Sequence, residues 1–162
     1  MKYTDIKDES LKASFKENAT LLKVPKNVQI ISVGDKIIDI PFLISGTIRV
    51  YSENYESGKE VLLYYLKGGE TCFMSIIAGL GDKISKVSAI TETDCELYSL
   101  PNSKVKEWQI AYPEWNNFIL GLMVKNYTNS IKTIEELSFL NIESRLINYL
   151  KKHHTNAGVT TV

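Results

Sequence analysis

Three features of the sequence predict a mainly β fold of the sandwich or barrel type, with helices before and after it. Short apolar runs separated by turns fill the stretch from about residue 28 to residue 100. An amphipathic helical pattern precedes this stretch, and after Pro101 the apolar spacing changes to the helical period. Many short strands with turns at regular spacing are typical of sandwiches and barrels.

Length and composition place the chain among ordinary globular proteins. Its 162 residues fit one domain, or one domain with an appendage. Hydrophobic residues make up 44% of the chain and charged residues 23%, which excludes a disordered polypeptide. The 19 basic residues equal the 19 acidic residues, so the balance argues against a chain that is mostly a nucleic-acid binder. A small basic patch is still compatible with this balance.

No segment reads as a membrane span or an export signal. No apolar run approaches the roughly 18 residues of a transmembrane helix, and the N-terminus has no apolar signal core. Cys72 and Cys95 are the only cysteines, and without an export signal we expect both to be reduced thiols. We therefore expect a cytoplasmic protein with no membrane partner.

The sequence lacks the residues of a catalytic or metal centre. His153 and His154 are its only histidines, so we expect no Cys-His pair and no serine triad in the main domain. Two cysteines cannot supply a four-ligand zinc or iron–sulfur site, and adjacent helical histidines point apart. There is no phosphate-loop pattern and no dinucleotide fingerprint. We expect a binding module, not an enzyme, with no catalytic residue and no metal.

The first helix is predicted over residues 5–23. Leu11, Phe15, Ala19 and Leu22 recur at spacings of four, four and three, which forms an apolar stripe on one helix face. Pro25 ends this helix, because proline lacks the N–H that a helix interior requires.

The strands are predicted from alternating or short apolar runs, each bounded by glycine-containing or polar turns. They cover residues 28–31, 47–51, 60–66, 86–90 and 95–100, with residues 41–46 leading into the second of them. A polar segment at 52–58 reads as the loop of a hairpin between two of these strands.

Beyond Pro101 a short helix is predicted over residues 103–111 and a long helix over about 114–137. One apolar set in the long helix follows spacings of 4, 3, 4 and 3, which is a heptad seam: Leu120, Val124, Tyr127, Ile131 and Ile134. A second apolar stripe covers a neighbouring face and fades after its last member: Trp115, Phe118, Ile119, Leu122 and Met123.

Two interpretations of the heptad seam stay open. Two parallel copies of the chain would bury it as a coiled coil, while the first half of the helix packs on its own strands. Alternatively, the helix packs wholly within the monomer. We favour the homodimer, with its interface along residues 114–137. Asn141 is a candidate N-cap for a further helix over residues 142–153.

Several motifs occur in a recognisable order, namely residues 34–35, 42–51, 58–61, 68–70 and 93–97. Together with the long helix, this order resembles the Crp/Fnr family of bacterial transcription regulators, in its cyclic-nucleotide-binding-like sensor domain. The resemblance covers roughly residues 10–155. It implies an α+β, mainly β fold: an antiparallel β-roll (double-stranded β-helix, jelly-roll-like) flanked by helices and followed by a long dimerisation helix.

The resemblance also divides the chain. Residues 1–113 would form the β-roll with its N-terminal helix, residues 114–138 the dimerisation helix, and residues 139–162 the start of a truncated winged helix-turn-helix DNA-binding domain. Glu143–Leu146 looks like the first helix of that domain. DNA would then be contacted only through a domain mostly absent from this chain, so we expect no sequence-specific DNA binding by residues 1–162 alone.

The segment after the Gly-Glu turn departs from the family pattern. Members that bind cyclic nucleotides carry a cassette there, with a helix N-terminus, a glutamate for the ribose and an arginine for the phosphate. Met74 stands at the glutamate position and cannot accept the ribose hydrogen bond, and Ser85 or Lys86 stands at the arginine position. No arginine lies between Arg49 and Arg145. We therefore expect a small-molecule effector other than a cyclic nucleotide, or a vestigial pocket.

The candidate effector pocket comprises Gly69, Glu70, Cys72, Phe73, Met74, Ser75, Ser85 and Lys86. Within it, Cys72 is either a redox- or metal-sensing thiol or a small buried apolar residue, and we favour the latter. Two other functions are alternatives to the regulator: a stand-alone nucleotide-binding module that acts on a protein partner, and a small cupin-like enzyme. A cupin needs metal-binding histidines on its roll, and this roll has none.

Overall fold

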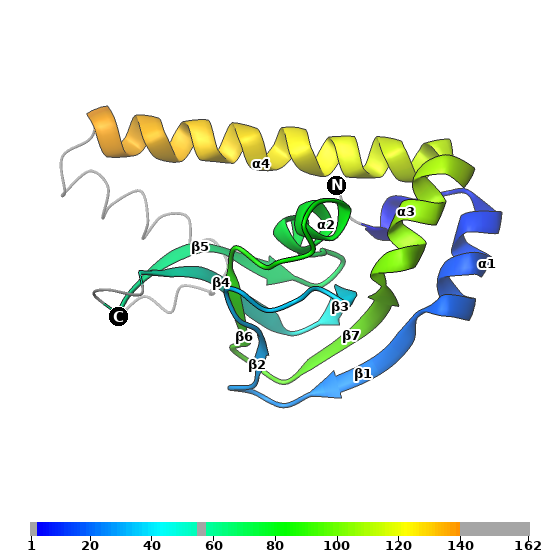
Figure 1. The fold of residues 1–162 in the computed structure, drawn as a ribbon, viewed down its shortest axis with the longest axis horizontal. Helices are drawn as coiled ribbons and strands as arrows, with labels where there is room; N and C mark the ends of the chain where they lie inside the picture. The colour runs from blue at the N-terminus through cyan, green and yellow to red at the C-terminus, as the bar shows by residue number, and fades with distance from the viewer. Residues whose placement is uncertain (1–2, 55–57, 140–162) are drawn as a thin grey trace, which may run out of the picture. The chain divides into compact units, whose positions relative to one another are not determined.

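The computed structural model describes residues 3–54 and 58–139 (Figure 1). The chain divides into two compact units, Met1–Leu122 and Met123–Val162. Within the described residues, the first unit contains all the strands, and the second consists of the C-terminal part of the last helix. The helix predicted over residues 142–153 and its N-cap Asn141 lie outside the described residues. None of the helices in the described ranges is both long and apolar enough to span a bilayer.

Along the chain, the N-terminal helices come first, the β-roll follows, and two further helices come last. They are the 3-10 helix η1 (Tyr3–Asp5), α1 (Glu9–Asn18), β1 (Thr20–Val24), β2 (Gln29–Ile31), β3 (Asp39–Ser45), β4 (Thr47–Asn54), β5 (Lys59–Lys67), α2 (Phe73–Leu80), β6 (Ser88–Thr91), β7 (Cys95–Pro101), α3 (Asn102–Ala111) and α4 (Pro113–Phe139). The strands form two antiparallel sheets, ordered β1-β7-β3 and β2-β6-β4-β5. The predicted β-roll with flanking helices and a long following helix is confirmed.

Two hydrophobic clusters lie on the two faces of the β1-β7-β3 sheet, because successive strand residues point to opposite sides. Leu43 and Leu97 belong to the cluster inside the roll, together with Ile48 and Val50 of β4. Phe42 and Leu100 belong to the cluster that the helices cover. We call these the roll core and the helix core.

The helix core is built around large aromatic side chains. Trp108 of α3 and Trp115 of α4 are fully buried, and their rings meet edge to face at 5.2 Å. Phe15 of α1 packs edge to face on Phe42 of β3 at 5.1 Å. The N-terminal part of α4 is held here, because Trp115 and Phe118 are both members of this cluster.

The helix predicted over residues 5–23 is wrong in its second half. Helix α1 begins after Asp8, whose side chain caps it by accepting hydrogen bonds from the N–H groups of Ser10 and Leu11, and it ends at Asn18. Leu22, which the helical stripe included, lies in β1 opposite Leu97 of β7. Pairing with β7 therefore overrides the local helical spacing, and Pro25 follows a strand rather than a helix.

The second apolar stripe of the long helix packs as predicted, except at its end. Trp115, Phe118, Ile119 and Leu122 are all buried, whereas Met123 is exposed. The first half of α4 thus contributes a complete face to the helix core, as the double stripe indicates.

Two glycines give a matched test of how closely the two sheets approach. Gly46, between β3 and β4, has φ of +93°, and a Cβ built on it would meet the Asp94 carbonyl oxygen at 2.5 Å and the Cys95 sulfur at 2.6 Å. Gly34 has φ of +91°, but nothing lies within 4 Å of its built Cβ. Both positions impose the left-handed backbone, and only Gly46 adds a clash with the neighbouring strand.

We expect Gly34→Ala to lower the free energy of unfolding by roughly 1–2 kcal/mol, the cost of the left-handed backbone alone. Gly46→Ala should lower it by about 1–3 kcal/mol more, because the new methyl group meets backbone that cannot move away easily. Urea unfolding followed by circular dichroism measures both losses. Equal losses for the two variants would contradict the close approach at Gly46.

Candidate functional site

The Gly-Glu turn after β5 is fixed to β3 by backbone hydrogen bonds. The Gly69 N–H donates to the Leu43 carbonyl, and the Leu43 N–H donates to the Glu70 carbonyl, both at 2.8 Å. The Glu70 carboxylate accepts a hydrogen bond from the Lys67 N–H at 3.0 Å. These bonds set the point at which the chain leaves the sheet and enters α2.

Helix α2 begins directly after Cys72, which occupies the N-cap position without a side-chain capping bond. The Cys72 thiol is buried and lies 3.6 Å from the Tyr64 hydroxyl of β5. Burial of the phenol, with the nearby thiol as a second cause, raises the pKa of Tyr64 well above its usual value. Cys72 is thus a buried residue and not a surface thiol, as expected of a small apolar side chain.

The next two residues of α2 point into the two different cores. Phe73 packs against the helix core and Met74 against the roll core. Met74 thus fills the family's glutamate position with a thioether in apolar surroundings, where it offers only a weak acceptor to a hydroxyl group. Ser75 is buried at 2% exposure.

The two residues at the family's arginine position are both already engaged. The Ser85 hydroxyl is buried and donates to the Val87 carbonyl at 2.7 Å. The Lys86 ammonium pairs with Asp82 at 2.8 Å on the surface, with 59% of its side chain exposed. Neither side chain is directed at a buried site as the guanidinium of a phosphate-binding arginine would be.

Arg49 is the only arginine among the described residues, and its side chain is held on the outside of the β2-β6-β4-β5 sheet. Its guanidinium pairs with Glu60 of β5 at 2.6 Å and with Glu92 at 2.9 Å, and it lies 4.4 Å from the centre of the Tyr51 ring. Two carboxylates and an aromatic face hold this cation in place. It is therefore not available to an anion inside the roll.

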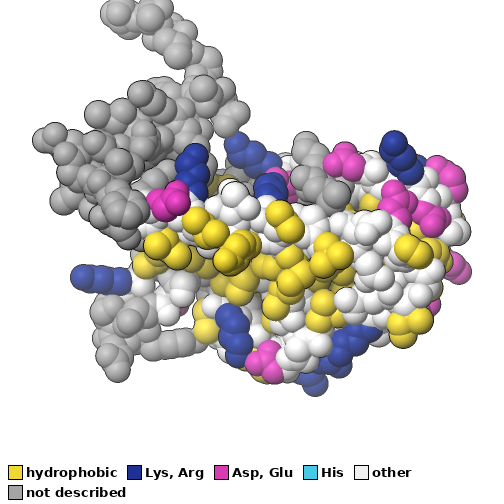
Figure 2. Space-filling model, turned by 90° about the horizontal axis from the view of Figure 1, so that it is seen from above, with side chains coloured by type: hydrophobic (Ala, Val, Ile, Leu, Met, Phe, Trp, Pro, Cys, Tyr) yellow, Lys and Arg dark blue, Asp and Glu magenta, His cyan; other side chains and the backbone are white. Residues whose placement is uncertain are grey.

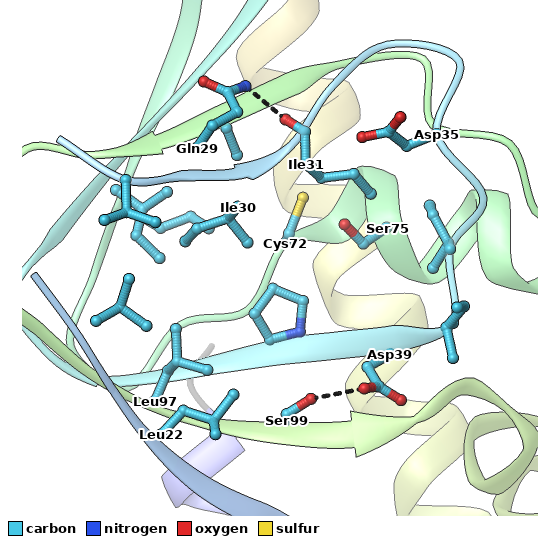
Figure 3. A pocket seen from close by; sticks show the side chains of 18 of the residues that line it. Leu22, Gln29, Ile30, Ile31, Asp35, Asp39, Cys72, Ser75, Leu97 and Ser99 are labelled. Carbon is cyan, nitrogen blue, oxygen red and sulfur yellow. Dashed lines mark hydrogen bonds between the residues drawn. The ribbon is translucent and has the colours of Figure 1, made fainter.

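A cavity of about 620 Å³ lies between the two sheets, in the first compact unit (Figure 3). This volume is in the range of small-molecule sites. Strands β1, β3 and β7 line one side, β2 and the following loop line the other, and Cys72 and Ser75 of the α2 start lie between them. Most lining side chains are aliphatic, and the charged ones are Asp35, Lys36 and Asp39.

The structure brings two of the eight predicted pocket residues, Cys72 and Ser75, to this cavity. The other six do not line it: Gly69, Glu70, Phe73, Met74, Ser85 and Lys86. The sequence reasoning does not assign to the pocket any of the lining residues of β1, β2, β3 and β7. Alternation along these strands indicates which residues face inward, but no local signal brings the strands together.

Helix α2 is attached at its other end by a buried amide. The Asn102 side chain at the start of α3 donates from Nδ2 to the Gly79 carbonyl at 3.0 Å, and the Asn102 N–H donates to the Ile38 carbonyl at 2.8 Å. Asn102 is 4% exposed, and its Oδ1 has no hydrogen-bond partner among the described residues. Asn102 thus links α3 to α2 through its side chain and to the loop before β3 through its backbone N–H.

The predicted heptad seam is exposed on α4. Its five side chains are between 40% and 69% exposed: Leu120, Val124, Tyr127, Ile131 and Ile134. Figure 2 looks down on this helix and shows hydrophobic side chains gathered along it. A row of apolar side chains at heptad spacing is the surface that a coiled-coil partner covers.

Comparison with known proteins identifies relatives of this chain. A family model described as the cyclic nucleotide-binding domain matches residues 21–109. The cAMP-activated global transcriptional regulator CRP of Haemophilus influenzae is 31% identical over 134 residues, which are 82% of this chain and 58% of the relative. CRP of Pasteurella multocida is 25% identical over 134 residues, which cover 82% of this chain and 62% of the relative. The chain thus spans about three fifths of these curated relatives.

Solved structures share the fold. A transcriptional regulator of the Crp/Fnr family from Eubacterium rectale has a TM-score of 0.78 and 21% identity, over 94% of this chain and 70% of that one. The c-di-GMP-responsive global regulator CLP of Xanthomonas campestris has a TM-score of 0.74 and 20% identity, over 89% of this chain and 71% of that one. The motif order, the roll and the match over residues 21–109 agree, and the chain belongs to the cyclic nucleotide-binding domain family, in the form found in Crp/Fnr regulators.

Proposed function

We propose that the chain is the ligand-sensing and dimerisation part of a Crp/Fnr-type bacterial transcription regulator, and that its effector is neither cAMP nor cGMP. The observation that carries the regulator role is the exposed heptad seam of α4 in a chain of this family. The curated relatives are named as transcriptional regulators. We assign DNA recognition to the part of such a regulator that lies outside residues 1–139. The described part would act without enzymatic chemistry.

The homodimer is supported by the contrast between the two apolar stripes of α4. One stripe is buried in the helix core, so it needs no partner, while Val124, Tyr127 and Ile134 are each more than 60% exposed. Burying a side chain of this size contributes about 1.5–3 kcal/mol relative to leaving it in water. Two seams in a parallel coiled coil would bury both sets at once, which favours a second copy of this chain as the partner.

The exclusion of cyclic nucleotides is supported by the chemistry of the cassette. A cyclic phosphate needs a matched cation, best a guanidinium with its planar fork of donors. Arg49 is held by two glutamates, Lys86 by Asp82, and Ser85 by its own loop. Met74 adds a thioether in place of the acceptor that a ribose hydroxyl requires. An anionic nucleotide would therefore lose its hydration without gaining charge-assisted hydrogen bonds.

We expect cAMP, cGMP and c-di-GMP at millimolar concentration each to shift the melting temperature by less than about 1 °C. A ligand present at 100 times its Kd would add about 2.7 kcal/mol and raise the melting temperature by several degrees. Differential scanning fluorimetry measures the shifts, with CRP of H. influenzae as a control that responds to cAMP. A shift of several degrees with any of the three would contradict the exclusion.

We expect Val124→Glu to weaken the homodimer by at least about 100-fold, because each seam would bury a carboxylate in place of an apolar side chain. Asn129→Glu is the matched control: it adds the same charge to an exposed position on a different face of α4 and should leave the dimer intact. Sedimentation velocity over a concentration series measures both. A wild-type chain that is monomeric at high concentration would overturn the proposed interface.

A further inference from the structure

The cavity between the sheets has buried walls without charged residues. Its aliphatic wall includes four side chains that are each at most 5% exposed: Ile48, Leu66, Ala89 and Leu97. The buried polar members of the lining are Cys72 and Ser75, both 2% exposed. Among the described residues, no lysine, arginine, histidine or acidic residue is both buried and part of the lining. A charged group that entered the cavity would therefore lose hydration without meeting an opposite charge.

The charged residues of the lining lie on its solvent-exposed side. Asp35, Lys36 and Asp39 are all exposed. Asp35 already accepts a hydrogen bond from the Ser32 N–H at 2.8 Å, and Asp39 accepts one from the Ser99 hydroxyl at 3.0 Å. The two carboxylates lie at opposite edges of the pocket in Figure 3. These charges are in contact with water and do not converge on one ligand group.

The cavity also has no flat platform for a ring. None of the aromatic residues in the described part of the chain lines it. The large aromatic side chains gather instead in the helix core, where Phe15 packs on Phe42 and Trp108 on Trp115. Proteins commonly hold a nucleobase by stacking it on an aromatic or guanidinium plane. Aliphatic walls without such a plane favour a flexible saturated molecule.

The size and the opening of the cavity suit a small molecule. An apolar cavity of about 150 Å³ holds benzene, and this one is about 620 Å³. Leu22, Val28 and Ile38 belong to its lining and are 41%, 39% and 71% exposed, so the apolar lining continues to the protein surface. Grouped exposed aliphatic side chains are typical of ligand-binding surfaces. A hydrocarbon chain can therefore enter from solvent and remain in apolar contact.

We propose that this cavity binds an uncharged, mainly aliphatic molecule, with its hydrocarbon chain against the buried aliphatic wall. All the residues that carry the proposal belong to the first compact unit. The driving force is the transfer of saturated carbon from water to these walls, and a ligand charge would oppose it. The inference names a ligand class for the effector of the proposed function, and it rests on that function only for the regulatory consequence.

The test uses straight-chain alcohols as neutral probes, with octanoate and octylamine as charged probes of the same chain length. Isothermal titration calorimetry with the full chain at neutral pH measures each affinity. From hexanol to octanol the affinity should rise about fourfold for each added methylene. Both charged probes should bind at least about tenfold more weakly than octanol. No detectable binding of octanol, or either charged probe binding as tightly as octanol, would overturn the proposal.

Two neighbouring leucines of β1 locate the site. Leu22 lines the cavity, whereas Leu21 does not, and successive strand residues point to opposite faces. Leu22→Asp adds a charge to the lining and should weaken octanol binding at least about tenfold. Leu21→Asp is the matched control, because it adds the same charge to the same strand at a side chain that is 52% exposed. It should change the affinity less than about twofold.

A second pair of variants changes volume instead of charge. Ala89→Leu fills part of the cavity from β6 and should weaken octanol at least about fivefold. Ala111→Leu makes the same change at an exposed position of α3 outside the lining and should leave the affinity unchanged. Thermal unfolding confirms that each variant is folded before titration, and Leu22→Asp alone decides the matter if Ala89→Leu does not fold.

Unchanged octanol binding in the folded Leu22→Asp variant would place the ligand elsewhere and overturn the proposal. Sedimentation velocity separates this outcome from that of the proposed function. A homodimer that ignores both cyclic nucleotides and alcohols retains the regulator role and loses this ligand class. A monomer that binds octanol in the cavity retains the site and loses the regulator role.

Discussion

The alternation of side chains along β3 and β7 is the constraint on which the rest of the molecule depends. Because β7 pairs with β1 on one side and β3 on the other, its odd and even residues are committed to opposite faces over the whole sheet. Leu97 faces the roll core and Leu100 the helix core. A register shift of one residue in either strand would move apolar residues into the wrong core. The same pairing therefore fixes both the cavity lining and the surface on which the start of α4 packs.

The interior that results is poor in cations, and this decides its chemistry. The roll has one arginine before residue 145, and the sheet geometry directs it outward, to Glu60 on the neighbouring strand and to Glu92. In a low-dielectric interior an anion without a counter-charge is costly. The departure of the cassette from the family pattern and the outward placement of Arg49 therefore both leave a bound anion without a counter-charge.

The sequence predicts those features that are encoded within one element. The heptad seam of α4 and its second stripe are visible because helical spacing alone places their residues on two faces. The strands are visible as alternating runs. The first helix is wrong beyond Asn18 because Leu22 satisfies the helical spacing as well as a strand, and only the pairing with β7 decides between them. The cavity is assembled from strands more than seventy residues apart, so Cys72 and Ser75 were found through a family motif and Asp39 was not found at all.

Helix α2 contacts both the cavity and the core that holds the start of α4. Ser75 and Cys72 face the cavity, while Ile76 and Ala78 belong to the helix core together with Trp115 and Phe118 of the α4 start. The strands around the cavity are fixed by their ladders, but α2 is held by packing and by the Asn102 amide at its far end. A ligand changes an equilibrium only by contacts that differ between its states. Any ligand contact at Ser75 or Cys72 would fall on a helix that also packs in the core holding the α4 start.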